Sequence, residues 1–222
     1  MTSLEAYNSF LIKLNRADSN SNINVPRGKF VIVFNEQAKK WLKEKLKRKL
    51  SSDEVNELSA LLADDQPLKL KKKNRDNYSF EKPSNFFSFA SSYSVAKKGD
   101  CEKVLDNWDT KSKDIRVLLR DENNKPSFDY EETLLKIAGS EIKVYFDDFQ
   151  IKQTFLSYYK EPKNIDIAGY ININGEPSKT INPELPDIGV NEIISRCVRE
   201  FTGITENPQG FAIAKDRITN EE

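Results

Sequence analysis

Histidine is absent from this 222-residue sequence, and cysteine occurs only twice. Without histidine, the chain lacks the side chain that most often acts as a general base near neutral pH, and His-based triads and zinc sites are excluded. Cys101 and Cys197 are too few for a disulfide framework, which favours synthesis in a reducing compartment. We predict that both are small buried residues and that they are not bonded to each other.

An excess of either charge is also missing, because Lys+Arg and Asp+Glu each number 35. The molecule as a whole is therefore not a general binder of polyanions. No apolar run approaches the roughly 20 residues that span a bilayer, and we expect no signal peptide at the start of the chain, where acidic Glu5 lies. Thirteen Phe and eight Tyr predict a substantial core beneath a charged surface.

The first 66 residues have the apolar spacing of amphipathic helices. Thr2 or Ser3 is expected to cap the first helix, and Pro26 suits the first turn of the second. Ser51 and Glu54 have the spacing of a capping box, which predicts a third helix over residues 52–63. This region is therefore expected to form a helical hairpin or a small bundle.

From Pro67 the apolar period changes to the alternation that is typical of strands. Asn174-Gly175 is expected to supply the positive φ angles of a tight hairpin turn at the end of the last predicted strand. Residues 85–105 fit either a strand or a helix, and residues 112–120 predict a short helix. Strands are expected over residues 67–73, 77–83, 130–139, 141–149, 153–162 and 165–173.

A final amphipathic helix is expected over residues 188–202, with Asp187 as its N-cap. We divide the chain into an N-terminal helical region (1–66), a mainly β region with a short helix (67–187), and a C-terminal helix with an extended tail (188–222). The predicted fold class is α+β. An N-terminal helical layer and the C-terminal helix form a bundle, and an antiparallel β region is inserted between them.

Two basic segments have competing interpretations. Lys39, Lys40, Lys43, Lys47 and Arg48 follow one helix, where they predict either a phosphate-facing surface or a solvated face whose lysine stems cover apolar area.

Lys69, Lys71 and Lys73 alternate with leucines in the next basic segment. They predict either contact with DNA or protection of an exposed strand edge. Neither segment carries an RNA-binding aromatic signature or a helix-turn-helix pattern.

No group of residues predicts catalysis or the binding of a metal or cofactor. The acidic pairs Asp64-Asp65, Glu131-Glu132 and Asp147-Asp148 lie where turns are expected. Lone Gly99 and Gly169 indicate turns or bulges and do not form a phosphate-binding loop. We therefore expect a protein that is not an enzyme.

Three tyrosines are candidates for a subunit interface. Strand alternation sends Tyr158 and Tyr159 to opposite faces of a sheet, so that one is expected in the core and the other at an interface. Tyr170, on the next predicted strand, is the third candidate.

Several segments resemble the head–tail connector proteins of tailed phages, most closely those of the crAss-like group. These segments contain residues typical of packing and turns, and together the segments cover most of the chain. The segments are FNEQAKKWLKEKL (34–46), AKKGDCE (96–102), KPSFDYEET (125–133), KVYFDDF (143–149), YYKEP (158–162), IDIAGY (165–170), INPELPD (181–187) and NEII (191–194).

This resemblance implies a virion structural protein of the neck, made in the host bacterial cytoplasm. It implies a ring, of twelve copies in this family, between the portal and other neck or tail proteins, with genome DNA passing through its channel. The two basic segments would then contact DNA or the portal. The alternative is a small nucleic-acid-binding protein that uses the Lys/Arg clusters at 39–49 and 69–75.

Overall fold

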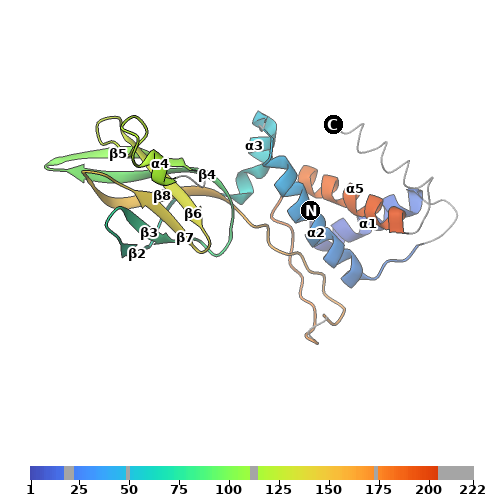
Figure 1. The fold of residues 1–222 in the computed structure, drawn as a ribbon. Coiled ribbons are helices and arrows are strands. Elements are labelled where there is room, and N and C mark those ends of the chain that lie inside the picture. The colour runs from blue at the N-terminus through green and yellow to red at the C-terminus, as the bar shows by residue number, and fades with distance from the viewer. Residues whose placement is uncertain (18–22, 49–50, 111–114, 173–174, 205–222) are drawn as a thin grey trace. The chain divides into compact units, whose positions relative to one another are not determined.

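The computed structural model describes residues 1–17, 23–48, 51–110, 115–172 and 175–204. The chain forms two compact units (Figure 1). The helical unit comprises Met1–Leu61 and Glu161–Glu222, and the β-rich unit comprises Leu62–Lys160. These limits differ from the sequence-based divisions after residues 66 and 187. The chain is α+β, with helices towards both ends and strands in the middle.

Two helices of the helical unit begin at capped positions. Thr2 Oγ1 accepts a hydrogen bond from the Glu5 amide at 3.2 Å, as the predicted cap requires. The predicted capping box is confirmed, because Ser51 and Glu54 exchange side-chain-to-amide bonds. The helices are α1 (Ser3–Ala17), α2 (Arg27–Lys45), α3 (Ser52–Leu58), the 3-10 helix η1 (Ser59–Leu61) and α5 (Asp187–Ile204).

Helix α5 packs against both α1 and α2, and aromatic rings fill the space between them. Phe10 of α1 lies 4.9 Å from Phe30 of α2 and 5.2 Å from Phe201 of α5, measured between ring centroids. Trp41 is completely buried. Burial of such side chains stabilises a fold by about 1.5–3 kcal/mol each, so both ends of the chain are needed to complete this core.

The connector between the β-rich unit and α5 is held on α2 by side chains. Asn35 accepts from the Ile165 amide at 2.8 Å and donates to the Ile165 carbonyl at 3.1 Å. The predicted strand over residues 165–173 is wrong within its described residues, which form only isolated bridges. The side chain of Asn35 bonds to the backbone of Ile165, and within the described part of the chain the backbone of Asp166 pairs only with Ile181. Of the predicted turn at Asn174-Gly175, Asn174 lies outside the described residues, and Gly175 has φ +82°.

The β-rich unit contains one sheet of eight strands, in the order β1-β8-β4-β5-β6-β7-β3-β2. Its single described helix, α4 (Ile115–Leu118), falls within the predicted helix 112–120, of which residues 112–114 lie outside the described part. The strands are β1 (Leu62–Pro67), β2 (Leu70–Lys73), β3 (Asn77–Glu81), β4 (Phe86–Lys98), β5 (Cys101–Asp109), β6 (Glu132–Ala138), β7 (Glu141–Tyr145) and β8 (Gln150–Lys160).

This sheet must curl. Eight flat strands would separate the two edge strands by roughly 34 Å. The chain passes from the end of β1 at Pro67 to the start of β2 at Leu70, a path of at most about 11 Å. Leu68, which is 5% exposed, packs into the core on the concave side of the curled sheet. That core also contains Leu105, Leu135, Ile142, Val144 and Leu156, none of which is exposed.

The fold class predicted from the sequence is wrong, because it required an antiparallel β region. Residues Asp106–Asp109 of β5 pair in parallel with Glu132–Leu135 of β6, so the sheet is mixed. The cause is the connection between these strands, which is a long crossover that includes α4 instead of a tight hairpin. The predicted third helix is also wrong beyond Leu61, where β1 begins and pairs with β8.

Candidate functional site

The basic helix α2 directs its cations to two different environments. Lys40, Lys43 and Lys47 are exposed and form no ion pair with any described residue. The side chain of Lys45 is only 10% exposed and points towards α3 and α5. Lys45 follows Trp41 by four residues, which places it on the buried stripe of the helix. The four-residue spacing from Trp41 was a signal in the sequence for a buried lysine, and the interpretation of the sequence missed it.

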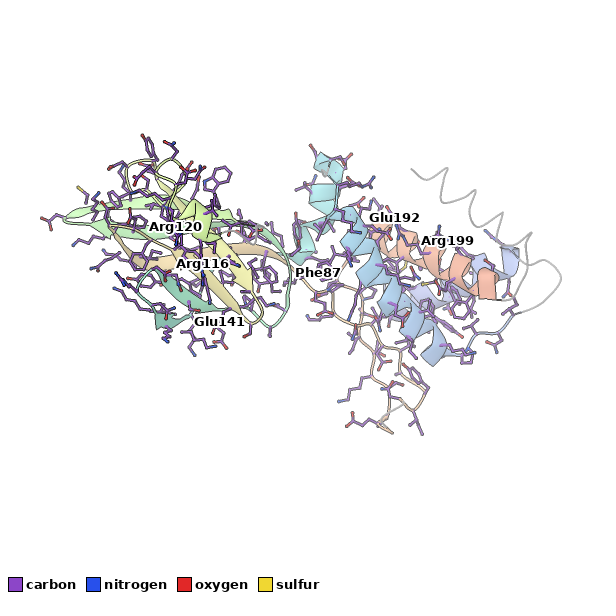
Figure 2. The ribbon with its side chains drawn as sticks, viewed as in Figure 1. Phe87, Arg116, Arg120, Glu141, Glu192 and Arg199 are labelled. Atoms are coloured by element: carbon purple, nitrogen blue, oxygen red, sulfur yellow. The ribbon has the colours of Figure 1, made fainter. Side chains whose placement is uncertain are left out.

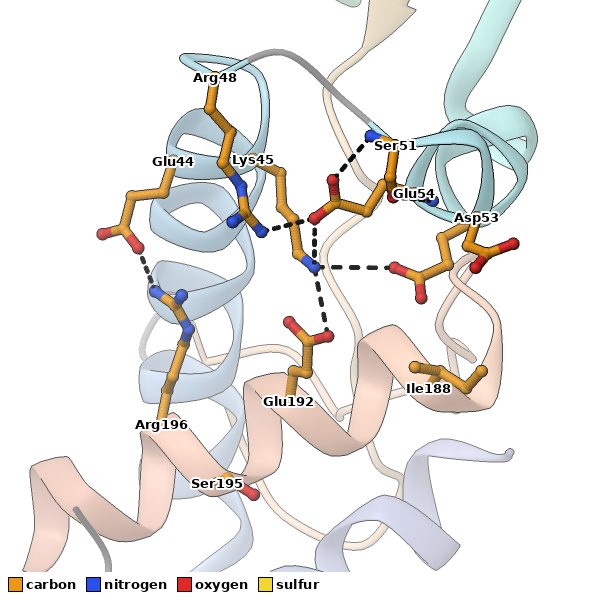
Figure 3. Close-up of a pocket in the computed structure, with 11 residues that line it drawn as sticks. Glu44, Lys45, Arg48, Ser51, Asp53, Glu54, Ile188, Glu192, Ser195 and Arg196 are labelled. Carbon is orange, nitrogen blue, oxygen red and sulfur yellow. Dashed lines mark hydrogen bonds and ion pairs between the residues drawn. The ribbon is translucent and has the colours of Figure 1, made fainter. Parts of the chain in front are cut away.

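Lys45 lies at the centre of three carboxylates (Figure 3). Its Nζ is 3.2 Å from Glu54 Oε1 and 3.8 Å from Glu57 Oε2, both from α3, and 3.3 Å from Glu192 Oε1 of α5. We call Lys45, Glu54, Glu57 and Glu192 the Lys45 cluster. A single ammonium therefore joins three helices, as a partly buried charge requires compensation from its neighbours.

Further side chains hold the Lys45 cluster in place. Trp41 Nε1 donates a hydrogen bond to Glu192 Oε2 at 2.5 Å. Arg48 pairs with Glu54, and Arg196 Nη1 lies 2.6 Å from Glu44 Oε2 on the neighbouring turns of α5 and α2. These side chains border an open pocket of about 900 Å³.

The carboxyls of the cluster differ in their affinity for protons. The amide of Ser51, followed by the side chain of Lys45, lowers the pKa of Glu54 below its ordinary value. Burial raises the pKa of Glu57, and the charge of Lys45 only partly opposes it. Glu57 Oε2 is buried without a hydrogen-bond partner among the described residues. The cluster therefore contains one carboxyl that is stabilised as an anion and one that is not.

Most polar side chains of the pocket are engaged by other groups of the protein. Its hydroxyls have structural partners, because Ser51 caps α3 and Ser195 donates to the Asn191 carbonyl at 3.1 Å. Lys45, Arg48 and Arg196 are all engaged by carboxylates. No group of three or more potential metal ligands occurs within the described residues. We interpret the Lys45 cluster as a clamp that fixes α3 on the helical unit.

Of the other basic candidates in this segment, some form ion pairs and some are exposed without one. Lys39 Nζ lies 2.7 Å from Glu161 Oε1, where the chain re-enters the helical unit. Arg48 is neutralised by Glu54 as described above. Among the candidate residues on α2 and in the turn that follows it, only Lys40, Lys43 and Lys47 form no ion pair with a described residue.

The second basic segment lies on β2, an edge strand of the sheet. Lys71 Nζ is 2.6 Å from Glu141 Oε1 of β7, and the position of Glu141 is labelled in Figure 2. Lys73 Nζ lies 5.1 Å from the ring centroid of Tyr78. Lys69 is exposed. This placement agrees with lysines that protect a strand edge, and contact with another molecule stays a prediction.

The three candidate tyrosines are not brought together. Tyr158 is 5% exposed and donates to Asn85 Oδ1 at 2.8 Å, so it belongs to the core of the β-rich unit. Tyr159 is half-buried. Tyr170 belongs to the connector of the helical unit, where it donates to Asp166 Oδ1 at 2.6 Å. Burial and this bond raise the pKa of Tyr170 to about 12.

The cysteines also differ from each other. Both are free. Cys197 is completely buried in α5, and this burial raises the pKa of its thiol. Cys101 is exposed at the start of β5, so its predicted burial is wrong. It follows the Gly99 turn, where the β4–β5 hairpin reaches solvent.

Neither a protein-family model nor a curated protein matches this chain. Among the helices that the structure describes, none has the length and apolar character needed to cross a bilayer.

Proposed function

We propose that this chain is a non-enzymatic structural protein of a virion, which assembles as a ring in the head–tail connector between portal and tail. The observation that carries the proposal is the interrupted helical unit. Helices from the two ends of the chain share one core, and the β-rich unit is inserted between them. The resemblance of the sequence to connector proteins implies a sheet inserted between helices that pair with each other.

The chemistry of the described residues supports a structural role. The cations of the pocket beside the Lys45 cluster are paired with carboxylates of other helices, and its hydroxyls cap or bond to the backbone. This arrangement gives rigidity to a building block, but it supplies no activated nucleophile. Rings of twelve copies, the portal as neighbour and passage of DNA through the channel remain parts of the proposal that come from the family resemblance.

The test uses a phage that carries this gene. Virions produced without the protein should accumulate as filled heads without tails or as heads that leak DNA, and complementation should restore tails. Antibody labelling of complete virions should place the chain at the neck, as seen by electron microscopy. Intact, tailed and infectious particles that lack the chain would overturn the proposal.

The nucleic-acid-binding alternative makes a different prediction. It requires the purified chain to bind DNA in the micromolar range with a strong dependence on salt. Changing Lys40, Lys43 and Lys47 to Gln should then weaken binding. No salt-sensitive binding, together with a normal neck position, would leave these lysines as a solvated face or a protein contact.

A further inference from the structure

The convex face of the sheet carries aromatic side chains near its β1 edge. Strand alternation places Tyr93, Asp106 and Trp108 on the face opposite the buried core residue Leu105. Tyr93 is the cross-strand partner of Asp106 and stacks on Phe155 of β8 at 4.9 Å between centroids. Trp108 is 58% exposed. An exposed tryptophan beside other aromatic rings is typical of an interface.

Acidic groups flank these rings. Asp64 and Asp65 lie at a bulge in β1, where Ser157 donates to Asp64 Oδ1. Tyr93 pairs with Phe155, which lies two residues before Ser157 on β8, so Asp64 lies on the same face of the sheet as the Tyr93 ring. None of Asp64, Asp65 and Asp106 forms an ion pair with a described residue. We call Asp64, Asp65, Tyr93, Asp106, Trp108 and Phe155 the acidic aromatic face.

The other edge of the sheet has the complementary chemistry. Residues Lys69–Lys73 form what we call the basic edge, which includes all of β2. Lys71 is engaged by Glu141, whereas exposed Lys69 and Lys72 have no ion pair within the described part of the chain. Leu70 is 51% exposed between them. The basic edge thus offers ammonium groups and an apolar side chain to a neighbouring molecule.

We propose that the basic edge of one copy docks on the acidic aromatic face of the next copy in the ring. Asp106 and Trp108 lie on β5, four strands away from β2 in the order of the curled sheet, and the two surfaces have opposite charge. Each copy can therefore engage one neighbour through each surface. Such a heterologous contact propagates around a closed ring. Carboxylates and the Trp108 ring both attract lysine, and Leu70 supplies apolar contact.

The contact is made by side chains and does not extend the sheet. The bulge at Asp64 and Asp65, and Pro67 at the end of β1, interrupt the row of backbone groups that a new strand would need. Charged side chains on β1 and β2 therefore oppose unselective pairing with the strands of other molecules. The opposite charges of the two surfaces favour one partner, which is a second copy of this chain. This inference rests on the proposed ring function.

Charge reversal on the full chain tests the interface. Variant A is Asp64→Lys with Asp106→Lys, and variant B is Lys69→Glu with Lys72→Glu. Asp65 is left unchanged, because its φ of +46° suits Asp better than Lys. Analytical ultracentrifugation at low salt should show self-association of the wild-type chain, and each variant alone should associate at least about tenfold more weakly.

Mixing provides the decisive measurement. Equimolar A and B should co-assemble, because each retains one surface that fits the altered surface of the other. The chain with all four changes should assemble alone. Emission from exposed Trp108 should shift to the blue on association, whereas emission from Trp41, which is already buried, should not. Thermal melting confirms that each variant is folded. Glu36→Lys with Glu122→Lys is the control for the charge change of variant A, and Lys40→Glu with Lys43→Glu is the control for that of variant B, because all four residues are exposed and lie outside both surfaces.

Two outcomes overturn the inference. One is a wild-type chain that stays monomeric at low salt and about 0.5 mM, a concentration at which even weak complexes form. The other is association that A and B do not weaken, or that mixing does not restore. Either result would remove this interface while leaving the neck position, which is tested by microscopy of virions, unaffected.

Discussion

The helical and β-rich units reach a stable core by different routes. The helical unit joins α1–α3 with α5, across the whole length of the inserted β-rich unit. The β-rich unit is continuous, and its first and last strands pair, with Leu62 opposite Tyr159. The insertion therefore enters and leaves the helical unit at adjacent positions. A domain can be accommodated inside another when its ends lie close together.

The interiors of the two units also differ in polarity. The helical unit holds a nearly buried cation, Lys45, among the carboxylates of the Lys45 cluster. The β-rich unit instead buries neutral polar groups between β4, β5 and β8. Ser94 Oγ donates to Asn107 Oδ1 at 3.0 Å and lies 2.9 Å from Thr154 Oγ1. Ion pairs thus fix helices that come from distant parts of the chain, and hydroxyl and amide bonds fix neighbouring strands.

The largest expected effect follows from separating the units. A fragment of residues 62–160 should fold on its own, because its ends are paired and its core is internal. It should give a dispersed amide NMR spectrum and a cooperative thermal transition. A fragment of residues 1–61 should remain largely unfolded, because it lacks the α5 side chains Ile193, Ile194 and Cys197, which are completely buried. A folded 1–61 fragment would contradict the proposed dependence.

The second effect concerns the clamp in the helical unit. Lys45→Met should destabilise this unit by about 2–3 kcal/mol, because it leaves three carboxylates without their shared cation. Denaturant unfolding followed by Trp41 fluorescence in a Trp108→Phe background measures it. The matched variant Lys43→Met removes an exposed lysine two residues away and should change stability by no more than about 0.5 kcal/mol. Equal effects of the two substitutions would show that the cluster has no special role.

A somewhat smaller effect is expected for the polar interior of the β-rich unit. Asn107 is 5% exposed and also donates to Ser92 Oγ at 2.7 Å. Asn107→Ala should cost about 1–3 kcal/mol, because buried hydroxyls lose their partner. Far-UV circular dichroism of the 62–160 fragment in denaturant measures the loss. Asn123→Ala, in an exposed loop, is the control, and a similar loss there would refute the explanation.

The smallest expected effect is a difference in pH dependence of stability between two carboxyls of the Lys45 cluster. The pKa of Glu57 is raised on folding, so the folded protein binds the proton more tightly than the unfolded chain. Its contribution to stability is therefore lost as pH rises above the ordinary value of 4.5. Glu57→Gln should be neutral or slightly stabilising at pH 7, and the gain should disappear as the pH approaches 4.5.

Glu54 provides the opposite case within the same cluster. Its pKa is lowered on folding, so its contribution is present above 4.5 and is lost as pH falls through its folded pKa. Glu54→Gln should destabilise the helical unit at pH 7. Melting temperatures measured between pH 3 and 8 for both variants make the comparison, and the same pH profile for both would refute it.

Local signals predicted much of the secondary structure. The capping box at Ser51 and the apolar stripe of α5 depend only on residues a few positions apart. The strand prediction for residues 165–173 failed because a connector can show the same alternation of apolar residues as a strand. Here the backbone of Ile165 bonds to the side chain of Asn35. Pattern alone does not reveal whether the hydrogen-bond partner is a strand or a side chain.

The candidate surfaces show a similar division. Lysine-rich segments are visible in the sequence, and the spacing of Lys45 from Trp41 indicates the buried side of the helix. The sequence does not show which carboxylates Lys45 contacts. The structure places Lys45 among Glu54, Glu57 and Glu192, which lie 9, 12 and 147 positions further along the chain. The acidic aromatic face was missed for the same reason, since Asp64, Tyr93 and Trp108 meet only through strand pairing.

The sequence by itself determined the absence of histidine chemistry, the balance of charge, and the capped amphipathic helices, because these depend on composition and on spacing within a few turns. Only the tertiary structure decided the parallel pairing of β5 with β6, the curl that places β2 close to β1, and the contact of Lys45 with Glu192. Each of these requires contacts between residues far apart in the chain. Such contacts are selected by the packing of the whole core, and no local pattern encodes them.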